Sequence, residues 1–447
     1  MKIRRVKWNN HPVLGNLELD LMNAATGQPY STLVFAGENG TGKTTILETL
    51  STFLNRGTFE PFEFIDYLAA GTELKAVRAN NSPHPNFYDY LDTHGQRTHI
   101  RTDKHNNPDV IEGTLLDIRR DGCVFSKARA DYKTQGIGAV TTKKLDVEKY
   151  DIDNEDDFTS LKQLIVDIQN QVNAEYAQLN QGLGAAPQPW NQYYLTSKIY
   201  RFKSAFDNFF GRLKYDKVSD LGNEKVIEFD KAGKKIPIDR LSTGEKQIVF
   251  RGIYLLRNNS KLDGAAIMVD EPELSMHPTW QKSILKFYKQ LFTTNGNQTV
   301  QLFVATHSEY VVEEALRDNS QNLVIVLAEN NGVIEAKRID APSVLPTITS
   351  AETNYLAFDI VSNDYHIELY GWLQINRTLP RVKACDTFIL NHPLYNPAIH
   401  YKPSAFGVTN YDTLCTFIRN AIDHPGPGQT FTEQELRTSI ELLIQIC

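Results

Sequence analysis

A glycine-rich segment, Gly37-Glu-Asn-Gly-Thr-Gly-Lys-Thr44, restricts what this chain can fold into more than any other feature of its sequence. It matches G-x-x-x-x-G-K-[ST], a pattern in which glycines let backbone N–H groups close around phosphate oxygens. The apolar run at residues 32–36 predicts a buried strand, and residues 45–54 carry apolar side chains at helical spacing. Strand, glycine loop and helix in this order predict a phosphate-binding loop in an α/β fold.

Two side chains of this loop have predicted roles in phosphate chemistry. Lys43 is expected to reach the β and γ phosphates, and the Thr44 hydroxyl is expected to bind Mg²⁺. The other loop residues predicted to contact the nucleotide are Gly37, Asn39, Gly40, Gly42 and Thr45.

A second site is predicted where the apolar run Ala265-Ala-Ile-Met-Val ends in Asp270 and Glu271. Asp270 is suited to hold Mg²⁺ through water, and Glu271 is suited to polarise an attacking water. On its own, such a strand end could be a helix cap or a solvated edge. Downstream of a phosphate loop, the catalytic interpretation is favoured.

A third segment, Leu241-Ser-Thr-Gly-Glu-Lys-Gln247, opens a predicted helix. A hydroxyl and a glycine at a helix N-terminus, as in Ser242 and Gly244, form an anion site. The residues Ser-Thr-Gly-Glu are also common at the start of a helix that has no ligand. Their position shortly before Asp270 is what favours a functional interpretation.

These segments, in this order, resemble the ABC ATPases. Residues 239–247 resemble the signature motif of that family, with Thr243 where the first glycine usually stands and Glu245 as in the SMC and Rad50 branch. Residues 270–278 resemble its Walker B and D-loop run. Phe303-Val-Ala-Thr-His307-Ser resembles the segment with the switch histidine.

The resemblance implies a catalytic role for Lys43, Glu271 and His307 in ATP hydrolysis, with ATP and Mg²⁺ as ligands and His307 as the γ-phosphate sensor. It also implies a head-to-head homodimer, or a higher oligomer. In that dimer, ATP bound by Lys43 of one copy is covered by Ser242 and Gly244 of the other.

The glutamine that contacts magnesium in the family is harder to locate. Gln135 is the best candidate, and Arg129 and Tyr132 could instead face the nucleotide. A purely structural role for these residues is an equal alternative.

The resemblance implies a P-loop fold of ABC type with a mainly parallel sheet. We expect the core to be split between residues 1–55 and 213–349, with an inserted α-rich arm region at 56–212. From about residue 351 the pattern predicts helices only, which gives a helical C-terminal interaction domain at 350–447.

The Asp-Glu-Pro-Glu-Leu-x-x-His-Pro run is most similar to that of prokaryotic ATPases such as the overcoming-lysogenization-defect-like proteins and the ATPase subunits of the Septu, PARIS and retron anti-phage systems. Such ATPases hold or regulate a nuclease. The resemblance therefore implies a sensor or scaffold that controls an effector nuclease, which this chain, with no acidic Toprim pattern after residue 345, would not itself contain.

Two alternatives remain at this stage. Arg419 and His424 resemble the R-x4-6-H motif of HEPN ribonucleases, which predicts an RNA-cleaving tail; the competing interpretation is an interaction bundle in which both residues are structural. The second alternative is a DNA-repair clamp like Rad50, recognisable by salt-dependent DNA binding.

The composition of the 447 residues is that of a globular protein, and the net charge of -7 confines any DNA or RNA contact to a local basic patch. The four scattered cysteines predict free thiols rather than a zinc site. Because no stretch approaches ~20 apolar residues, we expect a cytoplasmic protein with no membrane partner.

Overall fold

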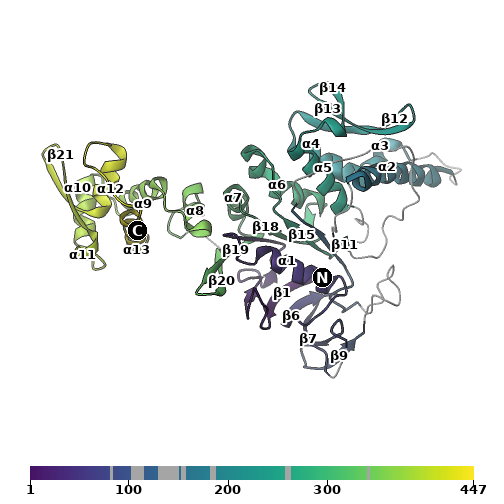
Figure 1. The fold of residues 1–447 in the computed structure, drawn as a ribbon, viewed down its shortest axis with the longest axis horizontal. Coiled ribbons are helices and arrows are strands. Elements are labelled where there is room, and N and C mark those ends of the chain that lie inside the picture. The colour runs from purple at the N-terminus through teal and green to yellow at the C-terminus, as the bar shows by residue number, and fades with distance from the viewer. Residues whose placement is uncertain are drawn as a thin grey trace. The chain divides into compact units, whose positions relative to one another are not determined.

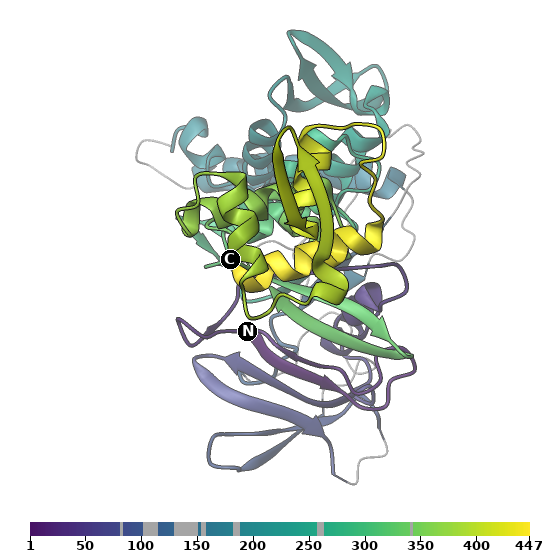
Figure 2. The same cartoon turned by 90° about the vertical axis from the view of Figure 1, so that its left-hand side faces the viewer.

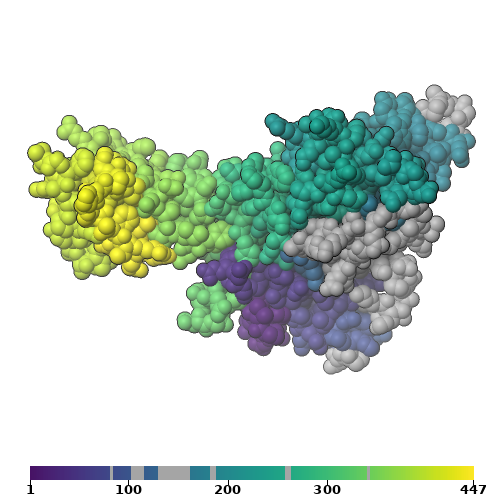
Figure 3. Space-filling model, turned by 45° about the horizontal axis from the view of Figure 1, so that its top comes forward, coloured from purple at the N-terminus to yellow at the C-terminus, as the bar shows by residue number. Residues whose placement is uncertain are grey.

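The computed structural model describes residues 1–80, 84–101, 115–128, 151–152, 158–181, 188–256, 263–339 and 343–447. The chain forms two compact units, Met1–Arg338 and Ile339–Cys447. Figures 1 and 2 show the elements of each unit as ribbons, and Figure 3 shows their side chains coloured by residue number.

The first unit is built on a seven-stranded sheet of order β11-β10-β15-β18-β5-β19-β20. Every adjacent pair from β11 to β19 runs parallel, which confirms the predicted mainly parallel α/β fold. β5, β15 and β18 are buried along their whole length, as expected for parallel strands covered on both faces. The strands are β5 (Thr32–Gly37), β10 (Cys123–Ser126), β11 (Asp151–Ile152), β15 (Ala266–Asp270), β18 (Gln301–Ala305), β19 (Asn322–Asn330) and β20 (Val333–Ile339).

Helix α1 (Lys43–Leu54) lies between this sheet and a second, antiparallel sheet. Its apolar residues Ile46, Leu50 and Phe53 share one core with side chains from both sheets. The helices α5 (Thr243–Leu256), α6 (Pro278–Leu291) and α7 (Glu309–Arg317) lie on the opposite side of the parallel sheet (Figure 1). α5 begins where the sequence predicted a helix.

The antiparallel sheet corrects the prediction of an α-rich insertion beginning at residue 56. Its first two strands pair with each other in antiparallel fashion, and the next four come from residues 62–100, for which no elements were predicted. β6 pairs with β1, and each later strand pairs with the one before it, so strand pairing gives these segments their strand conformation. In sheet order the strands are β2 (Glu18–Asp20), β1 (Lys2–Trp8), β6 (Phe62–Ala69), β7 (Thr72–Arg78), β8 (Tyr88–Leu91) and β9 (Arg97–Ile100).

The later part of the predicted insertion is helical, as expected. It contains α2 (Phe158–Gln181), α3 (Trp190–Tyr194) and α4 (Lys198–Phe209). An antiparallel sheet of β12 (Leu213–Leu221), β13 (Glu224–Lys231) and β14 (Lys234–Pro237) then leads through the short helix η1 (Ile238–Arg240) to α5. Two small hairpins complete the unit: β3 (Met22–Asn23) with β4 (Gln28–Pro29), and β16 (Thr293–Thr294) with β17 (Asn297–Gln298).

The second unit is not made of helices only, so that prediction was wrong. A hairpin of β21 (Tyr401–Phe406) and β22 (Thr409–Thr413) interrupts the helices. Most of β21 is exposed, so its sequence lacks the apolar alternation that signals a strand. The helices are α8 (Ser350–Phe358), α9 (Asn363–Asn376), α10 (Val382–Leu390), α11 (Pro397–His400), α12 (Leu414–Asp423) and α13 (Glu433–Ile446).

Residues 350–376 form two separate helices, α8 and α9. α8 ends at Asp359, which adopts a left-handed conformation with φ 54°, and Ser362 starts α9 by accepting a hydrogen bond from the Tyr365 N–H. In the same unit, α13 packs against α9 and α12 around a separate apolar core.

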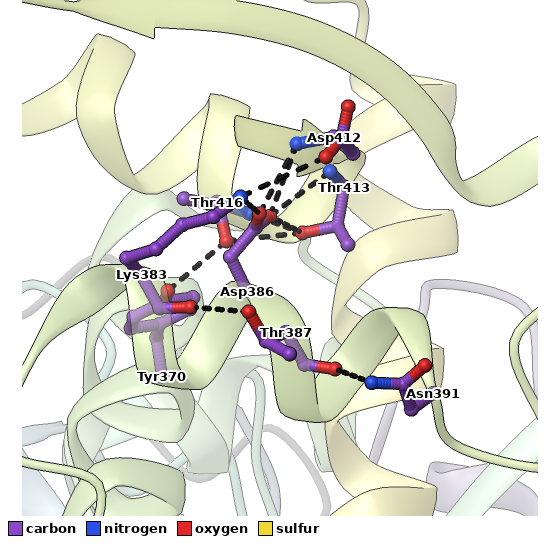
Figure 4. A network of polar contacts seen from close by, with 8 residues as sticks. All are labelled: Tyr370, Lys383, Asp386, Thr387, Asn391, Asp412, Thr413 and Thr416. Carbon is purple, nitrogen blue, oxygen red and sulfur yellow. Dashed lines mark hydrogen bonds and ion pairs between the residues drawn. The ribbon is translucent and has the colours of Figure 1, made fainter. Parts of the chain in front are cut away.

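A buried carboxylate organises the junction between β22 and α12 (Figure 4). Asp386 on α10 accepts hydrogen bonds from the Thr413 N–H (3.0 Å) and the Thr413 hydroxyl (2.8 Å). Its second oxygen accepts from the Lys383 ammonium at 3.0 Å and the Asp412 N–H at 3.2 Å. Thr413 is also the N-cap of α12, so Asp386 fixes where the hairpin ends and the helix begins.

Candidate functional site

The predicted phosphate loop lies where β5 ends and α1 begins, at the carboxyl edge of the parallel sheet. Gly37 has φ 127°, and a Cβ there would lie 2.2 Å from the carbonyl oxygen of Leu327. Gly42 has φ 88°, and a Cβ there would lie 2.5 Å from Leu14. Both positions therefore favour glycine through their backbone conformation, and at Gly37 the close approach of the Leu327 backbone also excludes a Cβ.

Lys43 is the first residue of α1, and its side chain turns back over the loop. Its ammonium donates to the carbonyls of Gly37 (2.8 Å) and Glu38 (2.7 Å) and is almost fully buried. Burial lowers the pKa of Lys43 to about 8, although the carboxylates of Asp270 and Glu271 act in the opposite direction. These carbonyl contacts are of the kind that phosphate oxygens can replace.

Thr44 and Asp270 are brought together from positions far apart in the chain. The Thr44 hydroxyl donates to both carboxylate oxygens of Asp270, at 3.2 and 3.0 Å. Burial raises the pKa of Asp270 to about 6; the Thr44 hydrogen bond opposes this, and Glu271 reinforces it. A hydroxyl and a carboxylate are hard oxygen donors, so this pair fits the chemistry of Mg²⁺.

Arg251 on α5 supports the end of β15, and the sequence reasoning missed it. Its guanidinium donates to the carbonyls of Asp270 (2.8 Å) and Glu271 (3.1 Å), and on its other side to the carbonyl of Lys127 (2.7 Å). A buried arginine within a helix matches no short motif. The signal would have been a charged residue on a helix that is otherwise buried.

Glu271 follows Asp270 in an unusual backbone conformation, with φ 44°. Its N–H donates to the carbonyl of Ala305 at the end of β18. Its carboxylate Oε1 lies 3.8 Å from Nε2 of His307, and about a third of each side chain is exposed. Burial and the nearby Lys43 ammonium lower the pKa of His307. The predicted water-polarising carboxylate and switch histidine therefore face each other beside the phosphate loop.

The signature segment forms the start of α5. The Ser242 N–H and hydroxyl both donate to one oxygen of Glu245, at 2.8 and 2.9 Å, while Lys231 binds the other at 2.8 Å. Burial pushes the pKa of Glu245 up, but these contacts outweigh it and hold the pKa below its usual value. A Cβ on Gly244 would lie 2.9 Å from the Ser275 carbonyl oxygen, so α5 touches the segment that follows Glu271. Ser242 itself is exposed.

Of the other predicted residues, three fall outside the described part of the chain and two belong to the second unit. Gln135, Arg129 and Tyr132 fall outside the described residues. Arg419 forms an ion pair with Asp423 at 2.7 Å, whereas His424 stacks on Phe406 with ring centroids 4.5 Å apart. No hydrogen bond or ion pair joins Arg419 to His424 in the part of the chain that the structure describes.

Residues 124–312 match the family model described as the AAA ATPase domain, a range that includes Ser242, Asp270, Glu271 and His307. The chain carries an AAA ATPase domain. This confirms the prediction of an ATPase from the motifs.

A curated relative, the "Retron Ec83 probable ATPase" of Escherichia coli, is 34% identical over 103 residues. The matched segment is 21% of this chain and only 18% of that relative.

Two similar solved structures are SMC head domains. The "SMC head domain from Thermotoga maritima" has 16% identity and a TM-score of 0.38, with 76% of this chain and 99% of that chain covered. An SMC head "bound to the C-winged helix domain of ScpA" has 12% identity and a TM-score of 0.39, with 76% and 98% covered. In the described part of the chain, no helix has the length and apolar character needed to cross a membrane.

Proposed function

We propose that this protein hydrolyses ATP at the site formed by Lys43, Thr44, Asp270, Glu271 and His307. The observation that carries this proposal is the contact between Thr44 and Asp270, because it joins the phosphate loop to the end of β15. Lys43 and the loop N–H groups would bind the phosphates. Thr44 and Asp270 would hold Mg²⁺, which when bound neutralises phosphate charge.

The chemical step assigned to this chain is the activation of water. The Glu271 carboxylate would accept a proton from the attacking water, and His307, whose Nε2 lies 3.8 Å from that carboxylate, would contact the γ-phosphate. Since the loop, β15 and β18 all end at one edge of the sheet, these groups converge without further rearrangement of the parallel strands.

Closure of the site would require a second copy. Ser242 is exposed at the start of α5 and contacts Glu245 of its own chain. We propose that this surface covers ATP bound to a partner copy, so that nucleotide binding drives dimerisation.

The biological role that we propose is that of a sensor and regulatory scaffold in an anti-phage complex, where the nucleotide state controls an effector nuclease. The similarity to the Retron Ec83 probable ATPase over 103 residues supports this role. The second unit, with its exposed hairpin, is the proposed docking part for that nuclease.

Hydrolysis is tested with Glu271→Gln, which keeps the size of the side chain but removes the base. We expect this variant to bind ATP with Mg²⁺ and to lose hydrolysis by at least about 100-fold, within the range that general-base catalysis supplies. Phosphate release and binding of a fluorescent nucleotide measure the two steps. Wild-type turnover in Glu271→Gln would show that the assigned base is wrong.

The defence role is tested in cells that express the chain with its neighbouring genes. Loss of phage protection in Glu271→Gln but not in His424→Ala would support the regulatory role. RNA cleavage or toxicity that disappears in His424→Ala would instead support the HEPN-like tail. ATP-dependent, salt-sensitive DNA binding by the purified protein would favour the DNA-clamp alternative.

A further inference from the structure

Glu273 lies two residues after Glu271, and its side chain points toward the neighbouring strand end. It is only 9% exposed. One carboxylate oxygen accepts two hydrogen bonds at 2.8 Å, from the Thr306 hydroxyl and from the backbone N–H of His307. The carboxylate therefore holds the backbone of the residue whose imidazole faces Glu271.

A second set of hydrogen bonds, through Gln281, holds the same loop at residue 308. The Ser308 hydroxyl donates to the side-chain oxygen of Gln281 at 2.6 Å, and the Gln281 amide donates to the Met276 carbonyl at 3.0 Å. The Ser308 N–H also donates to the Thr306 hydroxyl at 3.0 Å. Residues 306–308 are thus attached at two points to the segment 271–276.

The segment 271–276 is itself held in a strained conformation. Glu271 and Ser275 have φ of 44° and 62°, in the left-handed region that residues with a Cβ rarely adopt. Strained backbone of this kind persists where surrounding contacts determine it, and it concentrates at functional sites. Because the Ser275 carbonyl lies against Gly244, the start of α5 belongs to the same contact chain.

The second oxygen of Glu273 has no hydrogen-bond partner in the described structure. A carboxylate that served packing alone would be replaceable by an apolar side chain without loss, since burying an incompletely paired charge is unfavourable. Its position beside Glu271 and His307 therefore favours a role in the site over packing alone.

We propose that Glu273 is a positioning residue of the ATP site, which sets the distance between His307 and Glu271 by holding the His307 backbone. The proposal rests on ATP hydrolysis at this site. It assigns a role to a side chain that does not itself contact the reacting atoms, with Thr306 as its partner.

The experiment measures steady-state ATP hydrolysis by the full chain as wild type, Glu273→Ala, Glu273→Gln, His307→Ala and the double variant Glu273→Ala/His307→Ala. We expect Glu273→Ala to lower kcat by about 10- to 100-fold, because misplacement of a reacting group by about 1 Å has an effect of that size. KM should change by less than about 3-fold, since ground-state binding is not affected. Glu273→Gln should restore most of kcat, because its amide oxygen can accept the same two hydrogen bonds.

The double variant separates positioning from a general structural effect. If Glu273 acts through His307, then Glu273→Ala causes no further loss once His307 is alanine. The proposal would be overturned if the fold-losses in kcat of the two single variants multiplied in the double variant. It would also be overturned if Glu273→Ala and Glu273→Gln were both folded and equally inactive.

Two further variants keep the test decisive if Glu273→Ala does not fold. Thr306→Val removes one of the two donors with little change in shape, and it should lower kcat in the same direction; an unchanged kcat would count against the proposal. Glu352→Ala is the matched control: Glu352 is a buried carboxylate in the second unit that accepts from the Ser343 N–H and hydroxyl at 2.7 and 2.6 Å. It should lower thermal stability and leave kcat unchanged.

A wild type without hydrolysis would overturn the proposed function, whereas an active wild type with an equally active Glu273→Ala would overturn only this inference.

Discussion

At the scale of single residues, Lys43 and His366 show burial acting on two cationic groups with different outcomes. Lys43 lies among carboxylates, so its pKa remains near 8 and its ammonium stays mostly charged at neutral pH. His366 is fully buried on α9, where its Nε2 contacts the Ser439 hydroxyl at 2.8 Å. Burial lowers the pKa of His366 from 6.5 to about 3.

His366 should make the second unit sensitive to acid. The folded state keeps the imidazole neutral, whereas the unfolded chain binds a proton below pH 6.5; the folded-state pKa is therefore the lower one. Stability that is present above pH 6.5 should fall toward pH 3, by up to about 1.4 kcal/mol per pH unit. Chemical unfolding at a series of pH values measures this slope. His366→Gln should reduce it, and His392→Gln should not; an imidazole of His366 that titrates near 6.5 by NMR would contradict the prediction.

At the scale of elements, the important contacts join the ends of elements rather than their middles. The ends of β5, β15 and β18 assemble the proposed ATP site, and Arg251 holds the end of β15 from α5. In the second unit, Asp386 plays the corresponding structural role for the end of β22 and the start of α12. In both places one buried polar group satisfies backbone donors or acceptors that an element terminus leaves unpaired.

Removal of the buried Asp386 carboxylate should destabilise the second unit more than removal of the more exposed Asp412 carboxylate. Asp386→Ala leaves the Thr413 N–H without its acceptor and leaves the Thr413 hydroxyl only its contact with Thr416, at an expected cost of about 3 kcal/mol in unfolding free energy. Asp412→Ala, whose side chain is more than a third exposed, should cost less than about 1 kcal/mol. Urea unfolding followed by circular dichroism measures both. Equal costs for the two variants would show that the buried network does not control this junction.

At the scale of the whole molecule, one chain supplies one set of ATP-site motifs, and its exposed Ser242 contacts its own Glu245. A site built between two copies would explain why the signature start faces outward. A C2 dimer uses the same surface twice, so one pair of contacts forms two equivalent sites.

Ser242→Arg tests this arrangement. We expect the variant to bind ATP as a monomer and to lose hydrolysis, because the arginine blocks only the partner's site. Lys43→Ala should also be inactive, but a mixture of the two variants should recover activity, since a mixed dimer contains one intact Lys43–Ser242 pair. Loss of ATP binding in the Ser242→Arg monomer, or no recovery on mixing, would argue against composite sites.

The sequence alone determined those parts of the site that depend on contiguous residues. Local backbone conformation and burial pattern specify these parts. They are the glycines of residues 37–42, the lysine and threonine after them, and the buried strand before Asp270. The order of these motifs was enough to predict the α/β fold and to identify the ATPase domain, both now confirmed.

Only the tertiary structure decided which distant groups meet. Thr44 contacts Asp270 across 226 positions of sequence, and Glu273 holds a loop 34 positions away. Strands β6 to β9 and the β21–β22 hairpin escaped prediction because strand pairing, rather than local propensity, stabilises short segments of mixed polarity. Lys43 and Thr44 were predictable because neighbouring residues specify them. Arg251 and Glu273 were not, because their roles exist only where separate strand ends share one edge of the sheet.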